Sequence, residues 1–207
     1  MFVVMPSVRA GESSDSDWHL LFLTADGDEE AFRHLVERHQ DRLVGLCQRL
    51  LGDRQEALDA AQEVFLKVYS KADSLQPKGE LFTWMYRVAT NHCLNRIRRR
   101  KLVRFVSLTP EPQSDAPQLD PVDRAPDAHR ALEMKRRWQR AVEGIEALPE
   151  NQRVVLILAR FEGLSYRQIG EILKISEGAV ESRLYRAMRR LQRAQESAAS
   201  GVSEEGQ

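Results

Sequence analysis

The sequence is poor in features that would mark a disulfide-bonded, secreted or membrane protein. It has only two cysteines. Cys47 and Cys93 both fall inside predicted helices, so we expect buried free thiols rather than a disulfide. No stretch approaches the ~20 apolar residues that cross a bilayer, and the opening residues lack the basic region and apolar run of a signal peptide. We therefore expect a cytoplasmic protein without membrane insertion.

The chain also lacks the residue constellations of an enzyme or a metalloprotein. It has no nucleophile beside a base, no glycine loop that would cradle a phosphate, and no Cys/His cluster. His34 and His39 lie five positions apart on one predicted helix, which is not the i, i+4 spacing of a helical metal pair. We expect no catalytic residue, no metal and no cofactor.

Convincing strand-like alternation of apolar and polar residues is absent as well. Residues that favour helices are abundant, chiefly Leu, Ala, Arg, Glu and Gln. Asp28 and Asp53 can each cap the start of a helix, and Gly52 can end the helix between them. These signals predict an all-α fold.

The formal net charge of zero conceals an uneven distribution. Segment 76–104 has eight basic residues against one acidic, and segment 129–195 has 14 against eight. Segments 1–28 and 105–128 each have five acidic residues and one basic. Two separated basic patches suggest two nucleic-acid contacts, because neutralising phosphates supplies much of such affinity. Either patch taken alone is more typical of a solvated helix face.

Composition divides the chain into two small helical domains joined by an extended linker. Residues 107–128 are acidic and contain five prolines, which bar a helix. Ahead of the first domain, apolar residues around Trp18 and Leu21 can form a short helix that packs on it. The predicted organisation is an acidic leader (1–27), a first domain (28–104), the linker (105–129), a second domain (130–194) and a tail (195–207).

The stretch 164–191 has the pattern of a helix-turn-helix. Ser165 can cap a first helix, with Gln168 placed as in a capping box, and Ser176 can cap a second. The predicted buried stripe of the second helix is Val180, Leu184, Ala187, Met188 and Leu191. Its opposite face carries Glu181, Ser182, Arg183, Tyr185, Arg186, Arg189, Arg190 and Arg193. That face suits a major groove; the alternative is an ordinary helical hairpin with a solvated basic face.

A second candidate contact is the helix predicted to begin near Phe82. It joins aromatic residues to the basic run RIRRRK at 96–101. Rings beside cations suit single-stranded nucleic acid, whose bases stack on them. The rings also fit a core stripe, and we expect Trp84 to be a core residue. The residues alone leave open a stand-alone helix-turn-helix regulator with a helical sensor domain, and a pure interaction protein.

Three motifs in combination resemble bacterial RNA polymerase sigma factors of the extracytoplasmic-function (ECF) group. They are DAAQEVFLKVY, FTWMYRVATNHCLNRIRRRK and LPENQRVVLILARFEGLSYRQIGEILKISEGAVESRLYRA. The resemblance covers roughly 28–104 and 130–193, and implies sigma region two followed by region four. It implies a binding subunit, not a catalytic one, that brings core RNA polymerase to promoter DNA. Members are commonly held inactive by an anti-sigma factor, so such a partner is implied as well.

The resemblance also carries contact residues onto this chain. Those expected on the clamp helices of the polymerase's largest subunit are Asp59, Gln62, Glu63 and Phe65. The loop 71–80 matches the segment that captures a flipped −10 base. The −10 contacts are Lys71, Lys78, Asn91, Arg96, Arg98 and Arg99. The −35 contacts are Ser165, Tyr166, Arg167, Ser182, Arg183, Tyr185 and Arg186.

Four positions depart from the family's usual pattern, among them Asn95 in place of a common aspartate and Ala179 in place of a frequent threonine. Gly170 stands where alanine is frequent, and Glu181 where a basic residue is common. A carboxylate at Glu181 would repel phosphate unless it accepts a hydrogen bond from a cytosine amino group. The −35 sequence that this chain would read is therefore left open.

Overall fold

The computed structural model describes residues 16–77, 79–106 and 128–201. These residues form helices and no strand, which confirms the all-α prediction. The Pro-rich part of the predicted linker, the first part of the leader and the last residues of the tail lie outside the described residues. The helices are α1 (Asp17–Ala25), α2 (Glu29–Leu51), α3 (Arg54–Ser70), α4 (Leu81–Val106), α5 (Ala128–Glu146), α6 (Glu150–Arg160), α7 (Tyr166–Leu173) and α8 (Glu177–Gly201).

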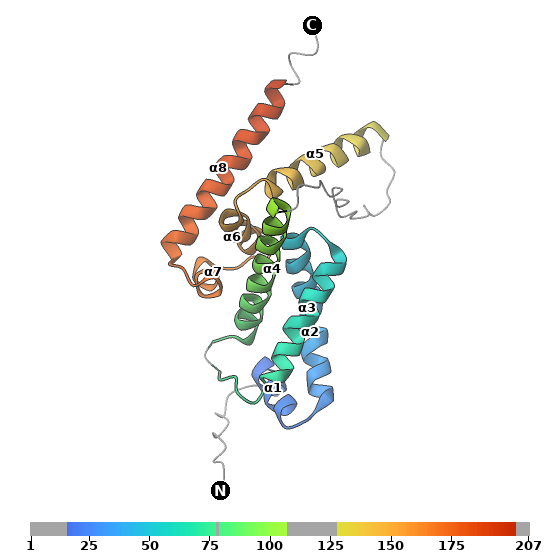
Figure 1. Ribbon diagram of the computed structural model, residues 1–207, viewed down its shortest axis with the longest axis vertical. Coiled ribbons are helices and arrows are strands. Elements are labelled where there is room, and N and C mark those ends of the chain that lie inside the picture. Colours follow the sequence, from blue (N-terminus) through green and yellow to red (C-terminus); the bar gives the residue numbers. More distant parts are fainter. Residues whose placement is uncertain (1–15, 78, 107–127, 202–207) are drawn as a thin grey trace.

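The helices fall into an N-terminal unit, α1 to α4, and a C-terminal unit, α5 to α8. Figure 1 shows α4 through the middle of the molecule, with α2 and α3 on one side and α6 to α8 on the other. Helix α7 packs on α4, and α6 packs on α2. The two units are therefore in direct contact.

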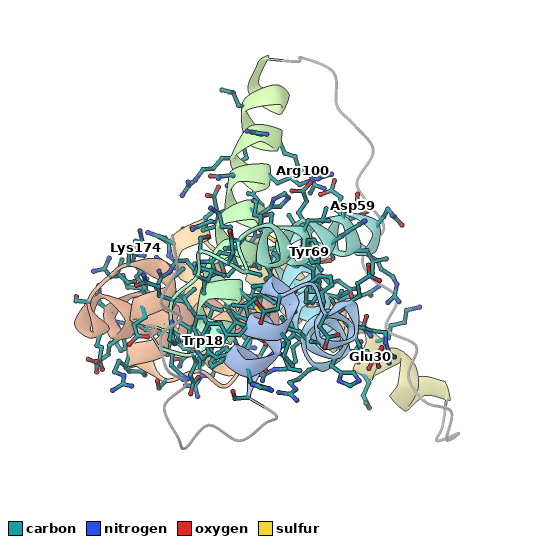
Figure 2. All side chains as sticks on the ribbon, turned by 90° about the horizontal axis from the view of Figure 1, so that it is seen from below. Trp18, Glu30, Asp59, Tyr69, Arg100 and Lys174 are labelled. Carbon is teal, nitrogen blue, oxygen red and sulfur yellow. The ribbon has the colours of Figure 1, made fainter. Side chains whose placement is uncertain are left out.

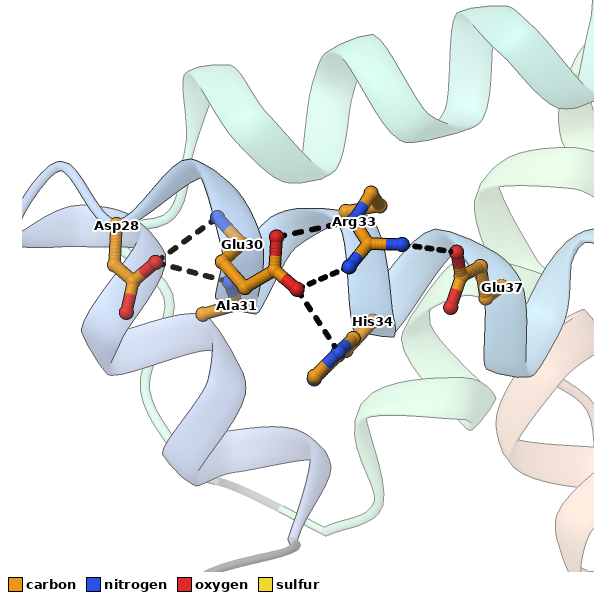
Figure 3. Close-up of polar contacts among 6 residues, drawn as sticks. All are labelled: Asp28, Glu30, Ala31, Arg33, His34 and Glu37. Carbon is orange, nitrogen blue, oxygen red and sulfur yellow. Dashed lines mark hydrogen bonds and ion pairs between the residues drawn. The ribbon is translucent and has the colours of Figure 1, made fainter.

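The start of α2 shows how local sequence signals set a helix boundary. The Asp28 carboxylate accepts hydrogen bonds from the backbone N–H groups of Glu30 and Ala31, at 2.9 and 3.1 Å (Figure 3). Arg33 then pairs with Glu30 and with Glu37, the latter at 2.8 Å. Such i, i+3 and i, i+4 pairs support the exposed face of a helix. The predicted cap at Asp28 is confirmed.

The other predicted caps of the N-terminal unit also form. Gly52 ends α2 with a φ of 76°, a left-handed conformation that glycine adopts without strain. The Asp53 carboxylate accepts from the backbone N–H of Glu56 at 2.8 Å and starts α3. Because α2 and α3 meet across this tight corner, they run side by side and bury their facing apolar residues.

A single apolar cluster extends through both units. Leu43, Leu46 and Tyr86 lie in its N-terminal part, and Leu158 and Ile169 in its C-terminal part, each with at most 1 % exposure. Burying a large apolar side chain contributes roughly 1.5–3 kcal/mol, so this cluster is the main source of stability.

The structure bears on several expectations about the core and the helix ends. Trp84 is half-buried and packs against the cluster, in line with the expected core role. Met188 is 43 % exposed, so its place in the predicted buried stripe of α8 is wrong. The described chain is helical as far as Gly201, beyond the predicted domain end at 194.

Candidate nucleic-acid and polymerase interfaces

Local hydrogen bonds set where the two helices of the helix-turn-helix, α7 and α8, begin. The Ser165 hydroxyl accepts from the backbone N–H of Gln168 at 3.3 Å, and the Gln168 side chain accepts from the Ser165 N–H at 3.0 Å. This is the predicted capping box. The Ser176 hydroxyl accepts from the backbone N–H of Ala179 at 3.2 Å and starts α8. Both predicted caps are confirmed.

The turn between the two helices depends on a close backbone approach at Gly170. The Gly170 carbonyl accepts from the Ile175 N–H at 3.0 Å. A β-carbon added at Gly170 would lie only 2.8 Å from the Ile175 carbonyl oxygen. The turn itself passes through Lys174, whose φ is 54°. Glycine at 170 therefore lets the turn fold tightly against α7, which gives a physical reason for the departure from alanine.

Helix α8 presents one face to the core and the other to solvent. Val180, Leu184 and Ala187 are buried. On the opposite side Tyr185 is 61 % exposed and Arg186 is exposed.

The remaining −35 candidates in α8 share this polar face. Ser182 and Arg183 are half-exposed, and Glu181 is exposed. Arg186 donates to the Ser182 hydroxyl at 2.9 Å, and Arg189 lies over the Tyr185 ring at 5.9 Å. These candidates thus contact residues of their own helix, and the polar face of α8 remains accessible to a ligand.

The start of α7 lies next to this face in the motif. Ser165, Tyr166 and Arg167 are all exposed, and Tyr166 is 40 % accessible. Arg167 reaches the Glu171 carboxylate at 3.7 Å, across one helical turn. The seven −35 candidates therefore come from two adjoining elements, the first turn of α7 and the solvent face of α8.

The basic run in α4 is held differently. Arg96 pairs with Glu56 at 2.9 Å, and Arg100 pairs with the same carboxylate. Lys101 and Arg98 pair with Glu150 of the C-terminal unit, at 2.6 and 3.6 Å. Four of the five cations of this run thus have carboxylate partners from α3 and α6.

Sequence reasoning missed both of these carboxylates. The Glu56 side chain, three residues after the Asp53 cap, reaches across to Arg96 and Arg100 of α4. Of the other −10 candidates in α4, Asn91 and Arg99 are exposed.

The loop between α3 and α4 is bounded by buried anchors. Ala72 and Leu81 are 4 % and 1 % exposed, and most of the described residues between them are exposed, while Leu75 is half-buried. Lys71 is exposed at the start of the loop. Lys78 lies outside the described residues. The described part of this loop can therefore be reached by a ligand.

The candidate polymerase face is on α3. Asp59, Gln62 and Glu63 are exposed on one side of the helix. Figure 2 shows Asp59 and Lys174 far apart, so this face and the helix-turn-helix turn lie on different parts of the molecule. Phe65 is only 8 % exposed and belongs to the core, so it cannot offer its ring at the surface. Leu66, which is 57 % exposed, is the apolar residue available beside Glu63.

A buried carboxylate joins the two units. The Glu162 side chain is 3 % exposed and pairs with Arg49 of α2. It also accepts a hydrogen bond from the Tyr86 hydroxyl at 2.8 Å. Burial, and then this carboxylate, raise the pKa of Tyr86 above its ordinary value. Nearby, Arg87 donates to the backbone carbonyl of Glu171 at 2.7 Å.

The described residues contain no cluster of three or more side chains able to hold a metal ion. None of the helices in the described segments is long and apolar enough to cross a membrane. Cys47 and Cys93 are buried and free, as expected. A hydrogen bond with Cys47, and then burial, raise the pKa of the Cys93 thiol, which keeps it protonated.

Comparisons with known proteins agree with these features. The family model for Sigma-70 region 2 matches residues 35–103, and that for Sigma-70 region 4 matches 138–191. The chain is 35 % identical over 175 residues to the ECF RNA polymerase sigma factor SigW of Bacillus subtilis, covering 81 % of this chain and 90 % of that protein. It is 31 % identical over 183 residues to the RNA polymerase sigma-H factor of Pseudomonas aeruginosa, covering 88 % and 95 %.

Two solved structures share the fold. One is CnrH in complex with the cytosolic domain of CnrY, with a TM-score of 0.62 and 23 % identity over 88 % of this chain and 99 % of that one. The other is the sigma factor RpoE in complex with the anti-sigma factor NepR from Bartonella quintana, also with a TM-score of 0.62 and 23 % identity, over 80 % and 96 %.

Both family matches fall on the elements that carry the candidate contacts. The region 2 match includes all of α3 and most of α4, which a stand-alone helix-turn-helix regulator would not need. Sigma factors are in general non-catalytic proteins that bind core RNA polymerase and promoter DNA. The chain therefore belongs to the ECF RNA polymerase sigma factors and directs promoter-specific initiation of transcription.

Proposed function

We propose that this sigma factor divides its contacts among three surfaces. The α3 face with Asp59, Gln62 and Glu63 docks on the clamp helices of the polymerase's largest subunit. The loop 71–80 and α4 bind the −10 element, and α7 and α8 bind the −35 element. The observation that carries this proposal is the open polar face of α8 beside the first turn of α7, above a buried stripe.

The −35 contacts would come from Ser165, Tyr166 and Arg167 on phosphates and from Ser182, Arg183, Tyr185 and Arg186 in the groove. The helix-turn-helix geometry supports this division, because the second helix of such a motif enters the major groove while the first crosses the backbone. Glu181 shares the exposed side of α8, where it would favour a cytosine.

The −10 contacts would come from Lys71, Lys78, Asn91, Arg96, Arg98 and Arg99. Exposed Asn91 and Arg99 support direct contact. Arg98 keeps 64 % of its side chain exposed despite its pairing, so it can exchange Glu150 for a phosphate. Arg96 is more enclosed by Glu56, and we assign it mainly to holding α4 on α3.

Phe65 leaves the proposed polymerase contacts because it is buried. Its role would be to hold α3 in place from the inside. Leu66 would replace it as the apolar contact, since it is exposed beside Glu63.

We further propose an anti-sigma factor as a protein partner and the cytoplasm as the working compartment. The shared fold with a sigma factor solved in complex with an anti-sigma factor supports the partner. The protein would have no catalytic activity of its own, because polymerase makes the RNA.

Reconstituted transcription tests the proposal. Sigma-free core polymerase is mixed with this protein and a genomic promoter library, and promoter-specific transcripts are expected. Glu63→Lys should lower affinity for core polymerase without changing thermal unfolding, because the side chain is exposed. Arg186→Ala should cost about 1–3 kcal/mol of −35 discrimination if it reads a base edge. An absence of transcripts across the library would contradict the proposed sigma-factor function. Wild-type affinity for core polymerase in Glu63→Lys would contradict the assignment of the α3 face.

A further inference from the structure

Helix α1 contacts the loop between α3 and α4, which is distant from it in the sequence. The indole N–H of Trp18 donates a hydrogen bond to the backbone carbonyl of Gly79, with the nitrogen and oxygen 2.8 Å apart. The two residues are 61 positions apart in the chain. Figure 2 shows Trp18 on α1. A segment from the leader therefore contacts the loop that would take a −10 base.

Helix α1 is a firmly held platform for this contact. Leu20 and Leu21 are 5 % and 0 % exposed in the core. The Asp17 carboxylate binds Arg38 at 2.9 Å and His39 at 2.8 Å on α2. Because Asp17 directly precedes Trp18, these contacts fix the position from which the indole reaches out.

In the described part of the loop, Leu75 packs half-buried against the apolar cluster, and Gly79 lies beyond this anchor. The hydrogen bonds described for its backbone are local and lie at its two ends, such as Leu75 N–H to Lys71 carbonyl at 2.9 Å and Thr83 N–H to Glu80 carbonyl at 3.1 Å. Gly79 has a φ of 95° and open space around its α-carbon. A side chain there would strain the backbone. Glycine thus permits the conformation in which this carbonyl meets the indole.

We propose that Trp18 is a positioning residue for the loop 71–80 and thereby sets base preference in the −10 element. This inference rests on the proposed role of the loop in capturing a flipped base. Flipping requires unstacking that costs a few kcal/mol. A loop already held in its binding conformation loses less entropy on contact, so more of the interaction remains for discrimination between bases.

Trp18→Phe tests the contact with little change to packing, because the ring is kept and the N–H donor is lost. Phe22→Leu is the matched control. Phe22 lies one turn along α1 with its ring centroid 6.4 Å from that of Trp18, so its replacement perturbs the same helix without removing the donor. In NMR spectra of the full chain, the Trp18 indole N–H should exchange slowly with solvent in the wild type and in Phe22→Leu. Fast exchange in the wild type would overturn the contact itself.

The functional readout uses holoenzyme and a fork-junction DNA library with a randomised single-stranded −10 segment. Trp18→Phe should reduce base preference at one position of that segment by about two- to tenfold, the range of one net hydrogen bond. Preference in a randomised −35 duplex and the melting temperature should stay at wild-type values. Phe22→Leu should keep the full −10 preference.

A third variant separates this inference from the function on which it rests. Replacing Ser74 to Pro77 by a Gly-Ser sequence removes the native side chains from the middle of the loop. If that variant loses −10 preference while Trp18→Phe keeps it, the role of Trp18 is overturned and the loop assignment stands. If neither variant alters −10 preference, the loop assignment fails and the role of Trp18 fails with it. An equal loss in the −10 and −35 libraries would show a general structural effect and would also overturn the inference.

Discussion

The two units hold their basic residues in different ways. In α4, Arg96 and Arg100 share the Glu56 carboxylate, and Arg98 and Lys101 share Glu150. In α8, Arg186 donates to a serine of the same helix and Arg189 lies over Tyr185. Both runs look alike as sequence, since each is a helix rich in arginine.

This difference separates charge that organises the fold from charge that is open to a ligand. Carboxylates from α3 and α6 hold the α4 run against its neighbours, so a phosphate must compete with them. For the DNA-contact candidates of α8, the contacts described are with other residues of the same helix. We therefore expect the C-terminal unit to bind duplex without rearrangement and the N-terminal unit to exchange partners first.

The largest expected effect breaks the junction between the two units. Glu162→Ala removes a 3 % exposed carboxylate and leaves the Tyr86 hydroxyl without that acceptor. We expect a loss of about 1.5–3 kcal/mol in the free energy of unfolding, the range for hydrogen bonds to a charged group. Urea titration measures this loss, and small-angle X-ray scattering should show a larger radius of gyration.

The control for the junction is Glu171→Ala on α7. Its side chain is 49 % exposed, and Arg87 binds its backbone carbonyl, which the substitution keeps. Wild-type stability and radius in Glu162→Ala would mean that the Glu162 carboxylate is not needed to hold the two units together.

The next effect is confined to the C-terminal unit. Gly170→Ala places a β-carbon 2.8 Å from the Ile175 carbonyl oxygen, so the turn must move. Overpacking of this kind typically costs about 1–3 kcal/mol. Calorimetry should show a lower melting temperature, with a parallel loss of −35 binding and unchanged affinity for core polymerase.

Gly178→Ala serves as the control in the same motif, because nothing lies within 4 Å of its added β-carbon. It should leave the melting temperature unchanged or raise it slightly. If both glycine variants behave alike, the close approach at Gly170 does not determine the turn.

A smaller effect should appear when the α4 cations are released. Glu150→Gln removes the partner of Arg98 and Lys101, whose side chains are 64 % and 66 % exposed. Exposed ion pairs contribute only about 0–1 kcal/mol, so stability should hardly change. DNA affinity should rise a few-fold, with a steeper salt dependence, because two more cations become available for phosphates.

Fluorescence anisotropy at several salt concentrations measures this gain. Glu143→Gln on α5 makes the same change of charge at an exposed position and is the control. An equal gain in DNA affinity in both variants would show that only net charge matters. It would contradict the view that the α4 cations are held by carboxylates while those of α8 are open to DNA.

The smallest effect is a pH dependence that belongs to the N-terminal unit. Burial alone would raise the pKa of the Asp17 carboxyl, but the hydrogen bonds and charges of His39 and Arg38 outweigh it and lower the pKa below 3.8. The stability that this group contributes is therefore present above pH 3.8 and is lost as pH falls through the lower folded value.

Asp17→Asn should remove this contribution and flatten the acid limb of stability below about pH 4. Urea titrations between pH 6 and 3 measure the change. Asp26→Asn, at the exposed other end of α1, should keep the wild-type limb. If the stability of Asp17→Asn falls with acid as it does in the wild type, the ion pairs of Asp17 do not anchor α1.

Local signals explain why so much of the fold could be predicted. The caps at Asp28, Asp53 and Ser165 act within three residues of themselves, so the sequence alone shows where those helices begin. The recognition face of α8 follows from helical periodicity in the same way. Met188 shows the limit, because periodicity assigns a side of the helix but not how far the neighbouring helices cover it.

Contacts between distant residues could not be predicted. Nothing in the spacing of Glu162 indicates that it meets Arg49 and Tyr86, which lie 113 and 76 positions away. The burial of Phe65 could not be predicted either, because a residue at the boundary of a polar stripe can face either solvent or core.

The sequence by itself therefore determined the all-α class, the helix-turn-helix and membership of the sigma family, because these depend on periodicity, caps and motifs within short stretches. Only the tertiary structure decided which cations are paired, which buried carboxylate lies between the two units, and that the Trp18 indole meets the Gly79 carbonyl. The reason is geometric. Side chains from separate helices meet only after those helices pack, and the order of residues along the chain does not record that packing.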